Sequence, residues 1–262
     1  MFFLGVDVGS LSCDAVIIDD DQKIIAWAVI PTGARNIESI ERVCANVLEQ
    51  AKISKEELGA TIATGYGRDR VAGRLASVTE ITCHARGIQA LLPGTEVLVD
   101  IGGQDSKVMR LNGSGQVLEF AMNDKCAAGT GRFLQAMARA LEIDVADLGS
   151  LDEGACGDLT LSSMCTVFAE SEVVSLIAEG VEVSEIVHGL HRAIASRTQA
   201  LVKRVAPDVG TRKIAMSGGV ARNTGVVKAL AAVLENEILC PRVPDITGAL
   251  GAALIARERT TS

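Results

Sequence analysis

Residues 2–20 read FFLGVDVGSLSCDAVIIDD, and residues 96–111 read EVLVDIGGQDSKVMRL. Each stretch is an apolar strand that carries an aspartate near its end, Asp7 or Asp100, followed by a glycine-containing turn and a returning apolar strand. Apolar, β-rich runs separated by a short polar turn are typical of hairpins. The repetition indicates an internal duplication, and two duplicated lobes would leave a cleft between them.

The remaining segments alternate between strand and helix patterns. In chain order, the further strands and helices are expected at residues 23–30, 37–51, 60–64, 83–91, 116–122, 213–216 and 245–256. This order favours an α/β fold. We expect a first lobe over residues 1–94, joined by the C-terminal helix within residues 245–262, and a second lobe over residues 95–244.

The composition narrows the class of protein. Of the 262 residues, 48% are hydrophobic and 22% are charged, which is typical of a folded globular chain. The formal net charge of −8 disfavours a nucleic-acid partner. The first strand has no basic leader and no apolar run reaches membrane-spanning length, so we expect a cytoplasmic protein without a membrane partner.

Three glycine-containing turns follow strands, after Asp7, after Asp100 and at residues 217–221 (SGGVA). Such turns can bring backbone N–H groups to phosphate oxygens, and an aspartate at a strand end can hold Mg²⁺ or its water shell. A single turn of this kind is explained equally well by the steric needs of a tight turn. The prediction of a nucleotide site therefore depends on all three occurring together, in a chain without a GxxxxGK[ST] or strand-following GxGxxG run.

This order of turns resembles that of the actin/hexokinase/heat-shock-70 ATPase superfamily, whose two phosphate loops and adenosine loop match residues 7–12, 100–106 and 217–221. The resemblance implies an actin-like fold with ATP or ADP in the interlobe cleft. We hypothesise that Asp7 and Asp100 position Mg²⁺ and the attacking water, with Asp105 as a second candidate for orienting that water. The expected nucleotide-binding residues are Gly9, Ser10, Ser12, Gly102, Gly103, Gln104, Gly129, Gly218 and Gly219.

Seven cysteines at irregular spacing do not fit a secreted disulfide framework and are expected to be reduced thiols. Cys126 and Cys165 each precede apolar residues at helical spacing, so both are expected at helix starts, where the helix dipole would favour a thiolate. A four-iron cluster needs about four thiolates, which a two-fold dimer could supply as two from each subunit. A third ligand at Cys156, or passive burial of all three, stays open.

Zinc is disfavoured because the chain has no CxxC pair and its histidines are remote in sequence or lie on a helix. His188 and His191, at i and i+3, are expected on a solvated helix face. The other cysteines lie in apolar strand or helix patterns and are expected to be passive; they are Cys13, Cys44, Cys83 and Cys240.

Two longer strings carry a closer resemblance: NDKCAAGTGRF at residues 123–133 and CTVFAESEV at residues 165–173. With TGYGR at residues 64–68 and SGGVA at residues 217–221, they resemble the activator ATPases of 2-hydroxyacyl-CoA dehydratases. That family includes the ATPase subunits of benzoyl-CoA reductase. The resemblance covers nearly the whole chain.

The resemblance implies a homodimer whose Cys126 and Cys165 hold one bridging [4Fe-4S] cluster. It implies ferredoxin or flavodoxin as donor, and a dehydratase, an aromatic-CoA reductase or another double-cluster protein as acceptor, with ATP hydrolysis driving the transfer. Asp14 departs from the pattern, because many members carry lysine there, so a phosphate-facing cation is missing. Two alternatives on the same fold are a sugar or metabolite kinase and a cluster-free regulatory ATPase.

Overall fold

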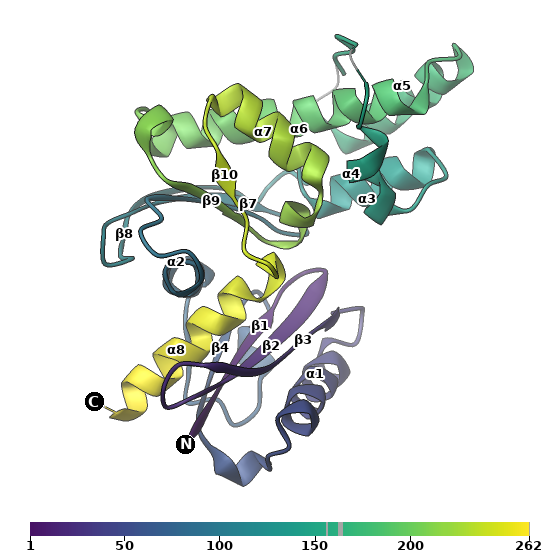
Figure 1. The fold of residues 1–262 in the computed structure, drawn as a ribbon. Helices are drawn as coiled ribbons and strands as arrows, with labels where there is room; N and C mark the ends of the chain where they lie inside the picture. Colours follow the sequence, from purple (N-terminus) through teal and green to yellow (C-terminus); the bar gives the residue numbers. More distant parts are fainter. Residues whose placement is uncertain (156, 162–164, 262) are drawn as a thin grey trace.

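The computed structural model describes residues 1–155, 157–161 and 165–261. Two five-stranded sheets form its two lobes, in the orders β3-β2-β1-β4-β5 and β10-β9-β6-β7-β8 (Figure 1). The strands are β1 (Phe2–Val8), β2 (Ser12–Asp19), β3 (Ile24–Pro31), β4 (Leu58–Thr64), β5 (Ala76–Ser77), β6 (Val97–Ile101), β7 (Ser106–Leu111), β8 (Val117–Asn123), β9 (Ile214–Ser217) and β10 (Ile238–Leu239). The α-helices are α1 (Asn36–Ala51), α2 (Glu80–Leu91), α3 (Gly131–Ala140), α4 (Leu148–Leu151), α5 (Thr166–Ala178), α6 (Val183–Val205), α7 (Thr224–Leu234) and α8 (Thr247–Thr261).

The same strand unit is used in both sheets. β1 pairs antiparallel with β2 and parallel with β4, while β6 pairs antiparallel with β7 and parallel with β9. The registers correspond, since Asp7 lies opposite Asp14 in the first hairpin and Asp100 lies opposite Lys107 in the second. The predicted α/β fold with two duplicated lobes is confirmed.

Helices cover both faces of the first sheet. Alternation along β1 turns Phe3 toward the buried alanines of α8, and Leu4 and Val6 toward α1, where they join Ile40 and Val43. The first lobe therefore packs one face of its sheet against the C-terminal helix (Figure 1). That helix begins at Thr247, after a 3-10 turn at Pro244–Ile246, and extends beyond the predicted residue 256.

Helix α2 lies between the lobes and packs along α8. A Cβ on Gly251 would lie 1.7 Å from the carbonyl oxygen of Cys83, so glycine is required where the two helices cross. The other side of α2 buries Ala85 and Ile88 against the second sheet. We propose that the first lobe ends at residue 94 in the sequence. Because α2 packs on both lobes, it forms the structural connection between them.

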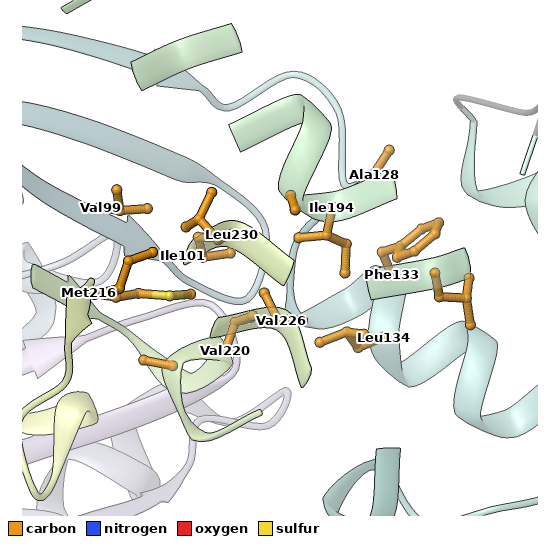
Figure 2. Close-up of a cluster of buried hydrophobic side chains, with 14 of the residues drawn as sticks. Val99, Ile101, Ala128, Phe133, Leu134, Ile194, Met216, Val220, Val226 and Leu230 are labelled. Atoms are coloured by element: carbon orange, nitrogen blue, oxygen red, sulfur yellow. The ribbon is translucent and has the colours of Figure 1, made fainter. Parts of the chain in front are cut away.

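The second lobe has its own core, which joins the central strands to the helices of the upper part of Figure 1. Figure 2 shows this cluster, with Val99, Ile101, Ala128, Phe133, Leu134, Ile194, Met216, Val220, Val226 and Leu230 labelled. Phe133 and Leu134, on α3, pack into the same cluster as Ile101, at the end of β6. The helix that follows Cys126 is thus anchored to the strand that carries Asp100.

Helix α5 is the least covered of the longer helices. Only Ala169 and Val173 are buried, and the exposed side chains include Val167, Phe168 and Val174.

Within the part of the chain that the structure describes, no helix is both long and apolar enough to cross a membrane.

Candidate functional site

A cleft of about 670 Å³ opens between the two lobes, within the range of small-molecule sites. All three predicted glycine loops line it. The predicted residues that do so are Asp7, Gly9, Ser10, Ser12, Asp100, Gly102, Gly103, Asp105, Gly218 and Gly219. Gln104 and Gly129 are not part of its lining. Gln104 is exposed, whereas Gly129 is buried, and a Cβ added there would lie 3.7 Å from Cδ of Arg197.

The two predicted catalytic aspartates are joined by a histidine that the sequence analysis missed. His84, on α2, places Nε2 3.3 Å from Oδ2 of Asp7 and Nδ1 3.1 Å from Oδ1 of Asp100. Burial disfavours the imidazolium, but the two carboxylates outweigh it and raise the pKa of His84 to about 10. Helix α2 begins at Glu80, earlier than the predicted residue 83, so His84 lies within its second turn, facing the cleft.

A buried lysine holds the second loop. Lys107 Nζ lies 2.8 Å from Oδ1 of Asp105, 2.8 Å from Oε2 of Glu80 and 3.4 Å from Oδ2 of Asp100. Burial opposes ionisation of Asp100, but His84 and Lys107 outweigh it and hold the pKa of Asp100 well below its usual range. Asp100 is therefore a carboxylate, and the charge of Lys107 is engaged by three carboxylates at the second loop.

Asp14 brings a further acidic group beside Asp7, its partner across β1 and β2. It is buried, Ser12 donates to its Oδ2 at 3.0 Å, and its Oδ1 has no hydrogen-bond partner among the described residues. Burial and the charge of Asp7 raise its pKa well above the usual range. Carboxyl oxygens are the donors that Mg²⁺ prefers, so Asp7 and Asp100, which line the cleft, fit that ion.

That fit concerns donor type only. Among the described side chains, no three of His, Cys, Asp or Glu are already grouped as a metal site. Water and phosphate oxygens would have to complete the coordination of Mg²⁺, as is usual for this ion in nucleotide sites.

A tyrosine joins the lobes at the cleft mouth. Tyr66, in the loop after β4, donates its hydroxyl to Oδ2 of Asp105 at 2.9 Å. Burial and this hydrogen bond raise the pKa of Tyr66 to about 12. Both oxygens of Asp105 are thus engaged within the protein, by Tyr66 and by Lys107. Its role in orienting water stays a prediction.

The second loop is bonded directly to the segment that follows Cys126. The N–H of Gly131 donates to the carbonyl of Gly102 at 2.9 Å, and the N–H of Arg132 donates to the carbonyl of Gly103 at 2.9 Å. The hydroxyl of Thr130 also donates to Gly103, at 3.0 Å. The second loop and the start of α3 are therefore joined by hydrogen bonds.

The two predicted cluster cysteines are both exposed. Cys165 is the N-cap residue of α5, as predicted. Cys126 was expected at a helix start, but α3 begins only at Gly131, because residues 127–130 form a turn in which Gly129 has a φ of +86°. The helix-dipole argument therefore applies to Cys165 and not to Cys126.

Cys126 and Cys165 both lie close enough to Arg197, on α6, to affect its pKa. Burial lowers the pKa of Arg197, while Cys126 and Cys165 act in the opposite direction. The Arg197 guanidinium lies 5.9 Å from the centre of the Phe133 ring. One chain supplies two exposed thiols, which is half of the thiolates that a four-iron cluster needs. The residues present fit such a cluster if a second chain supplies the other two.

Of the remaining cysteines, Cys13 and Cys83 are buried and Cys44 is half-buried, as expected for passive side chains. Cys240 was wrongly placed in an apolar element, because it follows the short β10 in an exposed position. Cys156, the possible third ligand, lies outside the described residues.

The solvated histidine face predicted on α6 is wrong for His191. Its ring is fully buried, with Nδ1 2.9 Å from Oδ2 of Asp152 and Nε2 3.1 Å from Nδ2 of Asn223. His188 is half-buried and contacts the other oxygen of Asp152 at 2.6 Å. Asn223 caps α7 and lines the cleft, so this network reaches the nucleotide site.

The chain is similar to dehydratase activators along nearly its whole length. The sequence is 45% identical over 258 residues to an activator of lactoyl-CoA dehydratase from Anaerotignum propionicum, covering 98% of each chain. It is 41% identical over 260 residues to an (R)-2-hydroxyglutaryl-CoA dehydratase activating ATPase from Acidaminococcus fermentans, covering 99% of this chain and 98% of the relative.

Solved structures agree with this similarity. The activator of the 2-hydroxyisocaproyl-CoA dehydratase from Clostridium difficile, with bound ADPNP, superposes with a TM-score of 0.94 at 42% identity, covering 100% of this chain and 96% of that one. A ROK-family glucokinase from Streptomyces griseus, in complex with glucose and AMPPNP, has a TM-score of 0.60 at 13% identity, covering 98% of this chain and 100% of that one, and shows the fold alone. The family model described as the BadF/BadG/BcrA/BcrD ATPase family matches residues 4–256, and the chain therefore belongs to that ATPase family.

Proposed function

We propose that this protein is an ATP-dependent electron-transfer activator. ATP hydrolysis would drive a low-potential electron from a [4Fe-4S] cluster, shared by two copies of the chain, to an iron–sulfur reductase or dehydratase. The observation that carries the proposal is the set of hydrogen bonds from residues 130–132 to the carbonyls of Gly102 and Gly103. They connect the predicted phosphate loop to the segment that holds Cys126.

In the cleft, different loops would bind the phosphates, the adenosine and Mg²⁺. The loops at Gly9–Ser12 and Gly102–Gly103 would approach the phosphates, and Gly218 and Gly219 would support the adenosine. Asp7 and Asp100 would hold Mg²⁺, which would neutralise phosphate charge when bound. Asp100 is suited to this, because its neighbours keep it ionised.

At the other end, Cys126 and Cys165 would hold the cluster, which supplies one-electron chemistry when bound. Both lie in the second lobe, beyond the loop that we propose contacts the nucleotide. A phosphate-dependent shift of Gly102 and Gly103 would be transmitted to Cys126 through the turn at residues 127–130. It would reach Cys165 through α3 and α5, which pack together.

The partners follow from the relatives, which are named as activators of acyl-CoA dehydratases. We propose a double-cluster iron–sulfur protein of that kind as acceptor, and ferredoxin or flavodoxin as donor. We propose a cytoplasmic location, because seven cysteines at irregular spacing do not fit a secreted disulfide framework. A sugar or metabolite kinase has less support, because the glucokinase shares only the fold with this chain, at 13% identity.

The test is iron and acid-labile sulfide per dimer in anaerobically purified protein. We expect about four irons per dimer, lost in Cys126→Ala and in Cys165→Ala. Cys240→Ala is the matched control, since it removes another exposed thiol and should retain the iron. Iron-free protein that still hydrolyses ATP would refute electron transfer and leave a cluster-free regulatory ATPase.

A further inference from the structure

A chain of hydrogen bonds passes through His191, on α6, behind the lining of the cleft. The side-chain oxygen of Asn223 caps α7 by accepting from the N–H of Val226 at 3.1 Å. The amide nitrogen of Asn223 therefore faces Nε2 of His191, at 3.1 Å, and donates to it. Because Nε2 accepts, Nδ1 carries the proton and donates to Oδ2 of Asp152 at 2.9 Å. Each group in this chain is thus held in one orientation by its partners.

Packing also holds the ring of His191 in place. Its side chain is fully buried. A Cβ on Gly225 would lie 2.2 Å from Nδ1 of His191 and 2.8 Å from Oδ2 of Asp152, so the backbone of α7 closes over this contact. A close-packed interior transmits displacement, because it has little empty space to absorb it. A shift of the start of α7 would therefore move His191.

At one end, this chain of hydrogen bonds reaches the adenosine side of the proposed nucleotide site. Asn223 lines the cleft together with Gly218 and Gly219. The 3-10 turn Gly219–Arg222 ends at Asn223, whose N–H donates to the carbonyl of Val220 at 2.9 Å. A nucleotide whose adenosine rests on this turn would therefore set the position of Asn223.

At the other end, the chain of hydrogen bonds reaches residues that precede Cys165. Asp152 follows α4 and is held by His191. The N–H of Gly157 donates to Oε2 of Glu185, also on α6, at 2.9 Å. Helix α5, which begins directly after Cys165, packs against α6 as well. Helix α6 therefore helps to position this cysteine from both sides along the sequence.

We propose that His191 is a positioning residue that joins the adenosine side of the cleft to Cys165. The inference rests on the proposed function and adds a connection separate from the hydrogen bonds between the second loop and the start of α3. Adenosine bound at the SGGVA turn moves Asn223, and His191 passes the shift to Asp152 and α6. Contiguous hydrogen bonds and packed side chains of this kind can carry coupling between distant sites.

The test follows alkylation of thiols by iodoacetamide in the reduced, metal-free full-length chain, with and without saturating ADP, and mass spectrometry resolves the cysteines. In wild type, ADP should change the rates at Cys126 and Cys165 by about fivefold or more, as is typical of allosteric coupling. His191→Leu keeps an apolar side chain in the buried site but cannot hydrogen-bond. In this variant the response of Cys165 should fall by more than half, while that of Cys126 should stay.

Two further variants separate positioning from simple support of the fold. The amide of His191→Gln can donate to Asp152 and accept from Asn223, so this variant should restore the wild-type response. His188→Gln is the matched control, since it alters the contact with the other oxygen of Asp152 and leaves the contact between His191 and Asn223 in place. Its response at Cys165 should match wild type. A merely structural role would change both thiols alike, even without nucleotide.

A wild-type response of Cys165 in His191→Leu, or equal losses at Cys126 and Cys165, would overturn the inference. The wild type provides a second readout, since the chain has only 3 histidines and their ring nitrogens can be followed by NMR. The His191 signals should shift when ADP is added, and signals that do not move would also overturn it. Failure to find iron in purified protein would refute the proposed electron transfer but would leave these measurements unaffected.

Discussion

Replacing Gly251 with alanine should separate α2 from α8 and so disturb the interlobe connection. The added Cβ would lie 1.7 Å from the carbonyl oxygen of Cys83 and 2.9 Å from the nitrogen of Gly87. Ordinary contact requires the helices to move apart by roughly 1.5 Å or more. Overpacking costs about 1–3 kcal/mol, and here the obstacle is backbone, so we expect the upper end of that range.

Alanine in a helix gains about 1 kcal/mol over glycine, so the net loss should be about 2 kcal/mol. For a chain of this size that corresponds to a fall in melting temperature of about 4–8 °C. Calorimetry of the variant measures it, and ADP titration should show weaker binding, because α2 carries His84 into the cleft.

The matched controls are Gly113→Ala and Gly210→Ala, where an added Cβ meets nothing within 4 Å. If Gly251→Ala had the same melting temperature as these controls, the helix crossing would tolerate a side chain and the reasoning would be wrong.

Three further predictions follow from the cleft and its surroundings. Asp100→Asn should abolish ATP-driven electron transfer with iron content intact; full turnover would remove its proposed role. Tyr66→Phe loses a cross-lobe hydrogen bond, and its free energy of unfolding in urea should fall by about 1 kcal/mol. Burial opposes ionisation of Asp152, but hydrogen bonds from His191 and His188 lower its pKa. The stabilisation is complete above the unfolded-state pKa of about 3.9 and is lost as pH falls through the lower folded-state pKa. Asp152→Asn should therefore make urea stability less sensitive to acid than in wild type, and an unchanged pH profile would contradict this.

Local patterns predicted the hairpins and the glycine loops. A strand, a tight turn and a returning strand are specified by neighbouring residues, so Asp7 and Asp100 were placed correctly at the cleft from the sequence. Cys165 was also placed correctly, because a helix that starts directly after a cysteine has a local signature. Cys126 was not, because a single left-handed glycine delays the helix.

The side chains that complete the site come from distant parts of the chain. His84 is 77 residues from Asp7, and Tyr66 is 39 residues from Asp105. No periodicity indicates such pairs, since they arise only when α2 is fitted between the two sheets. His191 was misplaced for the same reason: its partners, Asp152 and Asn223, reach it from α4 and α7. Apolar residues 186, 187, 190 and 194 around it were the available signal.

The return of α8 to the first lobe has a consequence for synthesis on the ribosome. Phe3 and Ile62 are made early, yet the helix they pack against includes Leu250 and Ala253. Leu250 is made 188 residues after Ile62 and 247 residues after Phe3. One face of the first sheet therefore stays uncovered by α8 while the second lobe emerges and folds. The N-terminal lobe is therefore the last to be completed, and nascent chains stalled before residue 256 should need a chaperone to protect the open face of β1.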